Sequence, residues 1–140
     1  MDAFDADVLI YAAVDGHPLG RRVRALFPAV PVGRSAALAG IGSVLLIPEL
    51  LARPARAEAV DELAKLEEFL GRLDLRPVDR ATAELATVLG GLYGLRAADA
   101  IHLATAVVAG ADRFLTDKPS GVPKTVTELR VVYPQELPVA

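Results

Sequence analysis

Short apolar runs alternate along this chain with longer segments whose apolar residues recur at helical spacing, and this alternation limits the possible folds more than any other feature. Apolar runs of strand length lie at residues 36–41, 75–78, 113–116 and 129–133. The clearest helical segment, residues 57–73, places Val60, Leu66 and Leu70 on one stripe. Strands that alternate with helices usually form a parallel sheet covered by helices, so we predict an α/β fold with about five strands.

Capping and breaking residues mark the ends of several helices. Asp79 is a suitable N-cap for a helix over residues 79–92, and a glycine follows both this helix and the next one, over residues 96–108. Another helix is expected after Ser43, which would cap it, and Pro54 would close it.

The beginning of the chain allows two interpretations. Residues 8–11 can be a buried strand, because they form a continuous apolar run. Alternatively, a short strand ends at Asp5 and a helix follows, with Asp7 as its cap. Local periodicity does not separate the two.

Length and composition favour a globular cytoplasmic protein. A chain of 140 residues favours one domain spanning residues 1–140. The absence of Cys excludes a disulfide scaffold, a thiolate zinc site and a cysteine nucleophile, and it fits a reducing cytosol. The N-terminus lacks the basic region of a secretory signal, and the longest uncharged stretch, residues 35–48, is shorter than the ~20 residues needed to cross a bilayer.

Charge and hydropathy bear on the partners. The net charge of −3 argues against a passive nucleic-acid binder, which usually gains affinity from basic residues that neutralise phosphates. An acidic chain can still bind RNA if cations bridge its carboxylates to phosphate. The mean hydropathy of +0.38 is high for a small monomer, so we expect a homodimer or a protein partner.

Four acidic residues lie where an α/β sheet places its function. Asp5 and Asp117 follow expected strands, Asp99 lies in the first turn of a helix, and Glu49 lies on the helix after the second strand. Asp5, Glu49 and Asp99 are set among apolar residues, where a carboxylate is costly to bury unless it is paired or bound to a cation. Hard cations such as Mg²⁺ prefer these oxygen ligands.

Each of these residues also has a purely structural interpretation. Asp5 can cap the next turn, Glu49 can be an ordinary exposed helix residue, and Asp117 can be a turn residue. Asp99 can stabilise the helix dipole, paired with Arg96. The four positions together indicate a site more strongly than any one of them.

The motifs around these acids resemble those of the PIN-domain family, in particular toxins of the VapC type. Residues 5–11 resemble its opening motif, Ser43 with Glu49 resembles the second, residues 96–106 resemble the third most closely, and residues 110–117 resemble the fourth. Their order and spacing cover the chain from residue 4 to residue 133.

The resemblance implies a three-layer α/β fold with a central parallel five-stranded sheet flanked by helices. It also implies an acidic pocket that binds Mg²⁺ or Mn²⁺, with Asp5, Glu49 and Asp99 as metal ligands. In that fold Asp5 ends the first strand and a short helix follows, and we adopt this interpretation. The implied activity is hydrolysis of RNA phosphodiester bonds by a toxin that a small cognate antitoxin controls.

Two positions depart from the family pattern. The fourth motif usually has one residue between Thr and Asp, whereas Thr116 and Asp117 are adjacent here. Asp117 is therefore expected to support the metal less directly, or through water. Asp7 replaces the usual Asn, and we expect it to cap the following turn.

Other polar residues near the acids have candidate supporting roles. Ser43 and Thr116 can orient carboxylates or water. Arg96, Arg113 and Lys118 can contact phosphate, although each can equally be a solvated surface charge.

The two histidines are assigned packing or surface roles. His102, three residues after Asp99, is expected to be packed and hydrogen-bonded, and His17 is expected to be exposed. With two His and no Cys, a zinc site is not expected. The chain also has no Gly-rich phosphate loop and no Ser-centred nucleophile elbow.

Three functions therefore remain open. The leading one is a metal-dependent endoribonuclease acting as the toxin of a type II toxin–antitoxin pair. The second is a metal- and RNA-binding module with little catalysis, which the shortened fourth motif favours. The third is a metal-dependent phosphatase or DNA nuclease that uses the same carboxylates.

Overall fold

The architecture is an α/β fold built on one parallel sheet. The computed structural model describes residues 1–35, 37–117 and 121–140. The strands are β1 (Asp2–Phe4), β2 (Gly40–Ser43), β3 (Leu73–Arg76), β4 (Arg113–Leu115) and β5 (Arg130–Val132). They lie in the order β3-β2-β1-β4-β5, and every pairing is parallel. The predicted five-stranded parallel sheet is confirmed.

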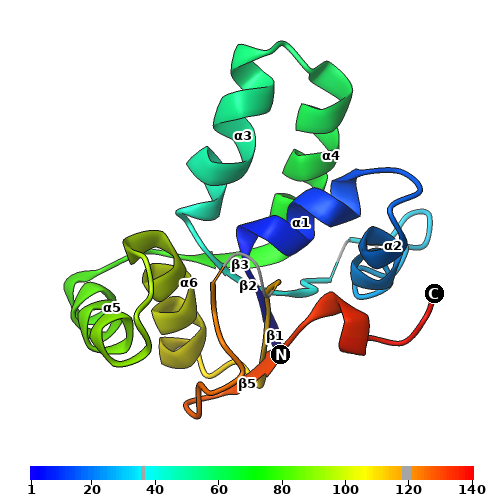
Figure 1. Cartoon of the computed structure of the whole chain (residues 1–140). Helices are drawn as coiled ribbons and strands as arrows, with labels where there is room; N and C mark the ends of the chain where they lie inside the picture. Colours follow the sequence, from blue (N-terminus) through cyan, green and yellow to red (C-terminus); the bar gives the residue numbers. More distant parts are fainter. Residues whose placement is uncertain (36, 118–120) are drawn as a thin grey trace.

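Helices cover the two faces of this sheet and complete three layers. They are α1 (Ala6–Ala13), α2 (Pro18–Arg24), α3 (Leu46–Arg56), α4 (Val60–Gly71), α5 (Arg80–Tyr93) and α6 (Ala97–Val108), with a 3-10 turn at Pro134–Glu136. In Figure 1, α3 and α4 project together as a pair, and α5 and α6 lie side by side on the other side of the molecule.

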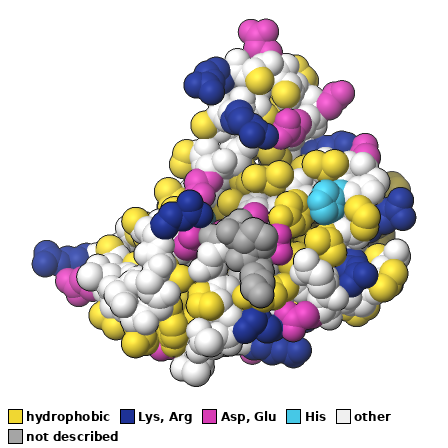
Figure 2. Space-filling model, viewed as in Figure 1, with side chains coloured by type: hydrophobic (Ala, Val, Ile, Leu, Met, Phe, Trp, Pro, Cys, Tyr) yellow, Lys and Arg dark blue, Asp and Glu magenta, His cyan; other side chains and the backbone are white. Residues whose placement is uncertain are grey.

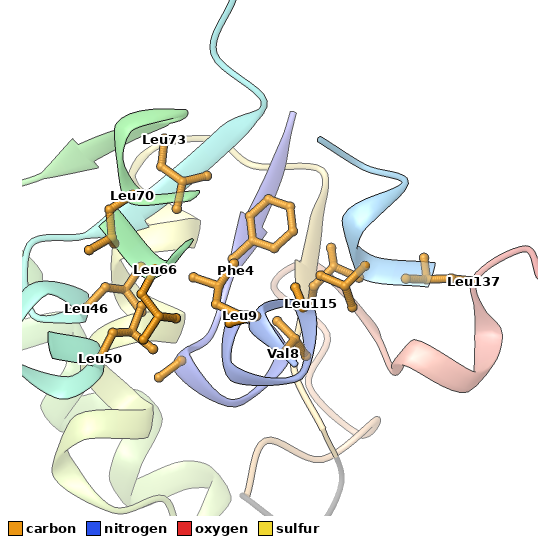
Figure 3. Packing of buried hydrophobic residues seen from close by; sticks show 14 of the residues in the cluster. Phe4, Val8, Leu9, Leu46, Leu50, Leu66, Leu70, Leu73, Leu115 and Leu137 are labelled. Atoms are coloured by element: carbon orange, nitrogen blue, oxygen red, sulfur yellow. The ribbon is translucent and has the colours of Figure 1, made fainter. Parts of the chain in front are cut away.

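Alternating residues of the strands point into two separate cores. Phe4, Leu115 and Val132 belong to a core shared with α1 to α4, which Figure 3 shows from close by. Their neighbours in sequence, such as Ala3 and Phe114, belong to a second core shared with α5 and α6. This is the alternation expected when both faces of a sheet are covered.

The second strand lies further along the chain than predicted. The expected strand at residues 36–41 begins at a residue outside the described part of the chain, and β2 occupies Gly40–Ser43 instead. A Cβ atom on Gly40 would come within 2.4 Å of the Asp2 carbonyl oxygen, and one on Gly42 within 2.5 Å of a Leu46 methyl carbon. The missing side chains of Gly40 and Gly42 let β1 and the start of α3 lie close to β2. In the sequence alone, the same glycines indicated that the strand ends before them.

Three predicted helix details were wrong. Asp5, not Asp7, is the N-cap of α1, since its side chain accepts a hydrogen bond from the Ala6 N–H. Pro54 does not end α3, which continues to Arg56 with the Pro54 side chain buried. Val60 does not belong to the buried stripe, because it lies at the start of α4 and is 71% exposed.

The described helices include none that is both long enough and apolar enough to cross a membrane.

Candidate active site

The acidic residues converge at the carboxyl ends of the central strands. Asp5 directly follows β1, and Asp117 follows β4, which pairs with β1. Asp99 lies in the first turn of α6, and Glu49 lies in the first turn of α3, the helix that follows β2. Figure 2 shows acidic side chains gathered near the middle of one face, below the projecting pair of helices. This is the edge at which open parallel sheets bind their ligands.

Asp5 is held in place by hydrogen bonds to both carboxylate oxygens. Its extended backbone, with φ −87° and ψ 166°, suits an N-cap, and Oδ1 accepts from the Ala6 N–H at 2.8 Å. Oδ2 accepts from the Thr116 hydroxyl, also at 2.8 Å. Asp5 is only 3% exposed, so Thr116 orients a buried carboxylate, the role suggested for it by the sequence.

Asp99 lies beside Asp5 and is also largely buried. Its Oδ2 is 3.4 Å from Nε of Arg96, whose guanidinium is mostly in solvent. On the other side, Gly121 approaches so closely that a Cβ atom there would lie 2.8 Å from the same oxygen. Gly121 also has φ +128°, which other residues rarely adopt. A glycine is therefore required where the chain passes Asp99.

Burial and the neighbouring charge of Asp99 both oppose ionisation of the Asp5 carboxyl group. Burial is the largest influence on the pKa of Asp5, and it raises that pKa above the usual range. The charge of Asp99 acts in the same direction, while His102, the Thr116 hydroxyl and the Ala6 N–H act against it. The net effect is a raised pKa, so an additional cation beside these carboxylates would stabilise the ionised form.

His102 contacts Glu49 and lies within electrostatic range of Asp5 and Asp99. Its Nε2 is hydrogen-bonded to Oε1 of Glu49, while Nδ1 is buried and has no hydrogen-bond partner in the described part of the chain. Burial lowers the pKa of His102, but the hydrogen bond to Glu49 and the charges of Asp5, Glu49 and Asp99 outweigh burial and raise it. The packed, hydrogen-bonded histidine predicted from the sequence is confirmed.

Asp117 is buried rather than being an exposed turn residue. It is 4% exposed, and its Oδ2 accepts a hydrogen bond from the Tyr11 hydroxyl. Its backbone N–H donates to Oδ2 of Asp7 at 3.1 Å. The hydrogen bond to Asp117 raises the pKa of Tyr11 to about 12. Tyr11 was not predicted as a site residue; the feature that could have indicated it is a hydroxyl-bearing aromatic residue one helical turn after Asp7 in an otherwise apolar run.

The remaining candidates have different surroundings. Ser43 is buried at the end of β2 and accepts from the Leu45 N–H at 3.0 Å, although Leu45 and not Ser43 is the N-cap of α3. Arg113 forms a bidentate pair with Asp2 at 2.8 Å for both contacts, so this side chain is occupied within the sheet. Lys118 lies outside the described residues.

A resident divalent cation suits the chemistry of this donor set. Asp5, Glu49 and Asp99 offer only oxygen donors, which Mg²⁺ and Mn²⁺ prefer. The pKa of Asp5 is raised mainly by burial and in part by the charge of Asp99, and a bound cation would oppose both effects. In the conformation described for residues 1–35, 37–117 and 121–140, no three or more His, Cys, Asp or Glu side chains are arranged to hold a metal ion together.

The solved structures that are similar to this chain include the following three. A toxin–antitoxin complex from Klebsiella pneumoniae contains a chain 22% identical in sequence, with a TM-score of 0.62, covering 93% of this chain and 99% of that one. VapBC2 from Rickettsia felis bound to a promoter DNA fragment gives 16% identity, a TM-score of 0.66, and coverage of 94% and 97%. FitAB bound to the IR36 DNA fragment gives 19% identity, a TM-score of 0.64, and coverage of 99% and 98%. At these identities the similarity establishes the fold.

Family membership comes from the sequence itself. A comparison with curated proteins found no significant match. The PIN domain profile matches residues 3–118, which include all four candidate acids and most of the sheet. This chain belongs to the PIN domain family.

Proposed function

We propose that this protein is a metal-dependent endoribonuclease that hydrolyses RNA phosphodiester bonds and serves as the toxin of a type II toxin–antitoxin pair. The observation that carries the proposal is the buried pair Asp5 and Asp99, where burial and like charge raise the pKa of Asp5. Such a pair is costly in a structural core and useful where a cation is to be bound. Nuclease activity is typical of PIN domains.

In this proposal Asp5, Asp99 and Glu49 hold Mg²⁺ or Mn²⁺. When bound there, the ion would supply Lewis-acid activation of the attacking water and charge stabilisation for the phosphate. Thr116 keeps Asp5 oriented through its hydroxyl, and His102 positions Glu49. Asp117, held by Tyr11, supports the site from the end of β4. In-line attack would leave a 5′-phosphate and a 3′-hydroxyl.

The proposed partners follow from the similar structures and from the surface. The Klebsiella chain belongs to a toxin–antitoxin complex, and by analogy a small cognate antitoxin would inhibit this chain in the cytoplasm. Exposed apolar side chains such as Val88 and Leu92 on α5 favour a homodimer or another protein contact.

A second candidate is a metal- and RNA-binding module with little catalysis. One specific observation favours it: two of the four acids already have hydrogen-bond partners on side chains outside the acidic cluster. Glu49 contacts His102, and Asp117 contacts Tyr11. If those contacts persist after metal binding, only Asp5 and Asp99 remain to coordinate the ion.

The test is cleavage of a mixed pool of structured RNAs in Mn²⁺, Mg²⁺ or EDTA. Asp5→Asn and Asp99→Asn should abolish cutting, whereas Asp61→Asn should not. Asp61 is a matched control for Asp99, because it is an acid in the first turn of a helix but is exposed on α4. Metal-stimulated cutting that survives Asp5→Asn would refute the assigned site.

Mn²⁺-dependent melting and a panel of other substrates separate the remaining candidate functions. Thermal stabilisation by Mn²⁺ without cutting of any RNA would favour the binding module. Hydrolysis of DNA or small phosphoesters in preference to RNA would instead indicate the phosphatase or DNA nuclease interpretation.

A further inference from the structure

Two aromatic rings from different helices stack at the margin of the acidic site. Tyr11 lies in α1, six residues after Asp5, and His17 is the N-cap of α2. Their ring centroids are 4.6 Å apart and the ring planes differ by 11°, so the rings are nearly parallel. Both side chains are partly exposed. An aromatic ring that is partly accessible can stack with a further ring through its free face.

The pair is held rigidly from both ends. The His17 Nδ1 accepts a hydrogen bond from the Gly20 N–H at 3.1 Å, which fixes the ring and places the imidazole proton of the neutral form on Nε2. The Tyr11 hydroxyl is tied to Asp117. A Cβ atom on Gly20 would lie 2.0 Å from the Tyr11 carbonyl oxygen, so only glycine lets α2 approach α1 this closely.

The position of the pair links it to the acidic cluster. A chain of contacts runs from the Tyr11 hydroxyl to Asp117, then through the backbone to Thr116, whose hydroxyl contacts Asp5. Among the other aromatic side chains in the described residues, the four Phe pack in or against the two cores, and Tyr93 packs with α5 and α6. Tyr133 lies nearer the site: its hydroxyl donates to the Val122 carbonyl, and its pKa is raised by burial and also by the charges of Glu136 and Asp117. Figure 2 shows a histidine side chain among hydrophobic ones on the face that carries the acids.

The charge of the protein makes a stacking surface useful. With a net charge of −3, the chain gains little affinity for nucleic acid from phosphate neutralisation. The acidic cluster itself repels phosphate in the absence of a cation. Stacking of a base on an aromatic side chain needs no positive charge and tolerates any base, since every base has a π-face.

We propose that the Tyr11–His17 pair is a stacking platform for an unpaired base of a single-stranded RNA, adjacent to the phosphodiester bond that the acidic site cleaves. The proposal rests on the proposed nuclease function for its substrate class. The platform binds a base by its face, and the hydrogen bond from Tyr11 to Asp117 places that base beside the acids. Specificity of this subsite is for an unstacked nucleotide rather than for one base, so helical RNA is excluded from it.

The test uses two substitutions at His17 with opposite structural effects. His17→Asn removes the ring but keeps an N-cap side chain that can accept from the Gly20 N–H. His17→Phe keeps a ring that can stack on Tyr11 but removes the cap. The probe is a short single-stranded RNA that contains one 2-aminopurine, titrated in EDTA so that hydrolysis does not occur. The quantities measured are the dissociation constant, the quenching of 2-aminopurine and the melting temperature.

The expected results cross over between the two variants. His17→Asn should melt like the wild type but bind the RNA about 5- to 150-fold more weakly, with less quenching. His17→Phe should melt at a lower temperature and still bind and quench. Equal binding and quenching by His17→Asn and the wild type, or no quenching by the wild type, would overturn the platform.

This result is separable from the test of the nuclease. A wild-type protein that binds with quenching but cuts nothing in Mn²⁺ or Mg²⁺ would support the platform and refute the proposed catalysis. A wild-type protein that cuts RNA as fast as His17→Asn, with equal KM, would support the catalysis and refute the platform.

Discussion

The buried imidazole of His102, on α6, is hydrogen-bonded through Nε2 to the carboxylate of Glu49, on α3. The two residues are separated by 53 positions in the sequence and belong to helices on opposite faces of the sheet. The side chain of Glu49 is one-third exposed, at 33%, so His102 supplies its fixed point within the protein. A metal ligand oriented in this way loses less conformational freedom when it binds.

His102→Leu should therefore weaken metal binding more than it weakens the fold. It removes the anchor of Glu49, and loss of such an outer contact typically lowers metal affinity about 10- to 100-fold. It also removes the buried unpaired Nδ1, which offsets part of the cost of the substitution. Calorimetric titration with Mn²⁺ measures the affinity, and Glu49→Gln is the comparison. If His102→Leu bound Mn²⁺ as tightly as the wild type, Glu49 would either not need His102 for its orientation or not be a metal ligand.

Asp5→Asn should stabilise the metal-free protein at neutral pH. The pKa of Asp5 is raised by folding, so the native state binds its proton more tightly than the unfolded chain does. Native stability therefore falls as pH rises from the unfolded pKa, about 3.9, through the folded pKa. Asn carries no charge, so the variant does not lose stability in this way as pH rises. Its side-chain oxygen can still accept the hydrogen bond from the Ala6 N–H.

Melting curves across pH check this prediction. The variant should melt several degrees above the wild type at pH 7 without metal, and the difference should shrink below about pH 4. Mn²⁺ at about a hundredfold excess over its dissociation constant should stabilise the wild type by about 2.7 kcal/mol and the variant much less. A variant that melts lower than the wild type at every pH would show that Asp5 is structural.

Local sequence signals predicted the helix that brings Asp99 to the site and the helix before it, whereas the strand that ends at Asp5 was assigned from the family resemblance. Asp79 caps α5 and Gly94 ends it in a left-handed conformation, as expected from residues within one turn of each end. Asp99 lies in the first turn of α6, which begins at Ala97, one residue after the predicted start. These features depend on backbone groups three or four residues away, so a single sequence contains the information.

The contacts that define the site were beyond local reasoning. The partners of Asp117, Glu49 and Asp5 lie 106, 53 and 111 positions away in the sequence. Which of many polar residues meets which depends on how strands and helices pack. For the same reason the stacking of His17 on Tyr11 was not predicted: His17 was expected to open a helix and to be exposed, and it does cap α2, but it is only partly exposed.

Tyr11→Phe should remove the high tyrosine pKa and loosen Asp117. The hydrogen bond to Asp117 is present while the hydroxyl is protonated, so its contribution to stability is complete below the ordinary tyrosine pKa of about 10 and is lost as pH rises through about 12. Loss of the donor to a buried carboxylate should cost about 1–3 kcal/mol at pH 7.

Ultraviolet titration of the tyrosines distinguishes the effect of Asp117 on the pKa of Tyr11 from the effect of burial. The wild type should contain one tyrosine that titrates near pH 12 and that is absent in Tyr11→Phe. Asp117→Asn should move this tyrosine back toward about 10, because the negative partner is removed. An unchanged titration in Asp117→Asn would assign the shift to desolvation instead.

Gly121→Ala should disturb Asp99 specifically, and a second glycine provides the control. The new Cβ atom would lie 2.8 Å from Oδ2 of Asp99, and φ +128° would be strained in alanine. Gly110 also has a positive φ, +73°, but nothing lies within 4 Å of its Cβ position. Both alanine variants should lose about 1–3 kcal/mol of stability through backbone strain. Only Gly121→Ala should also lose affinity for Mn²⁺, since it alone displaces a proposed ligand. If calorimetry gave equal Mn²⁺ affinities for the two variants, Asp99 would not be a ligand of the metal ion.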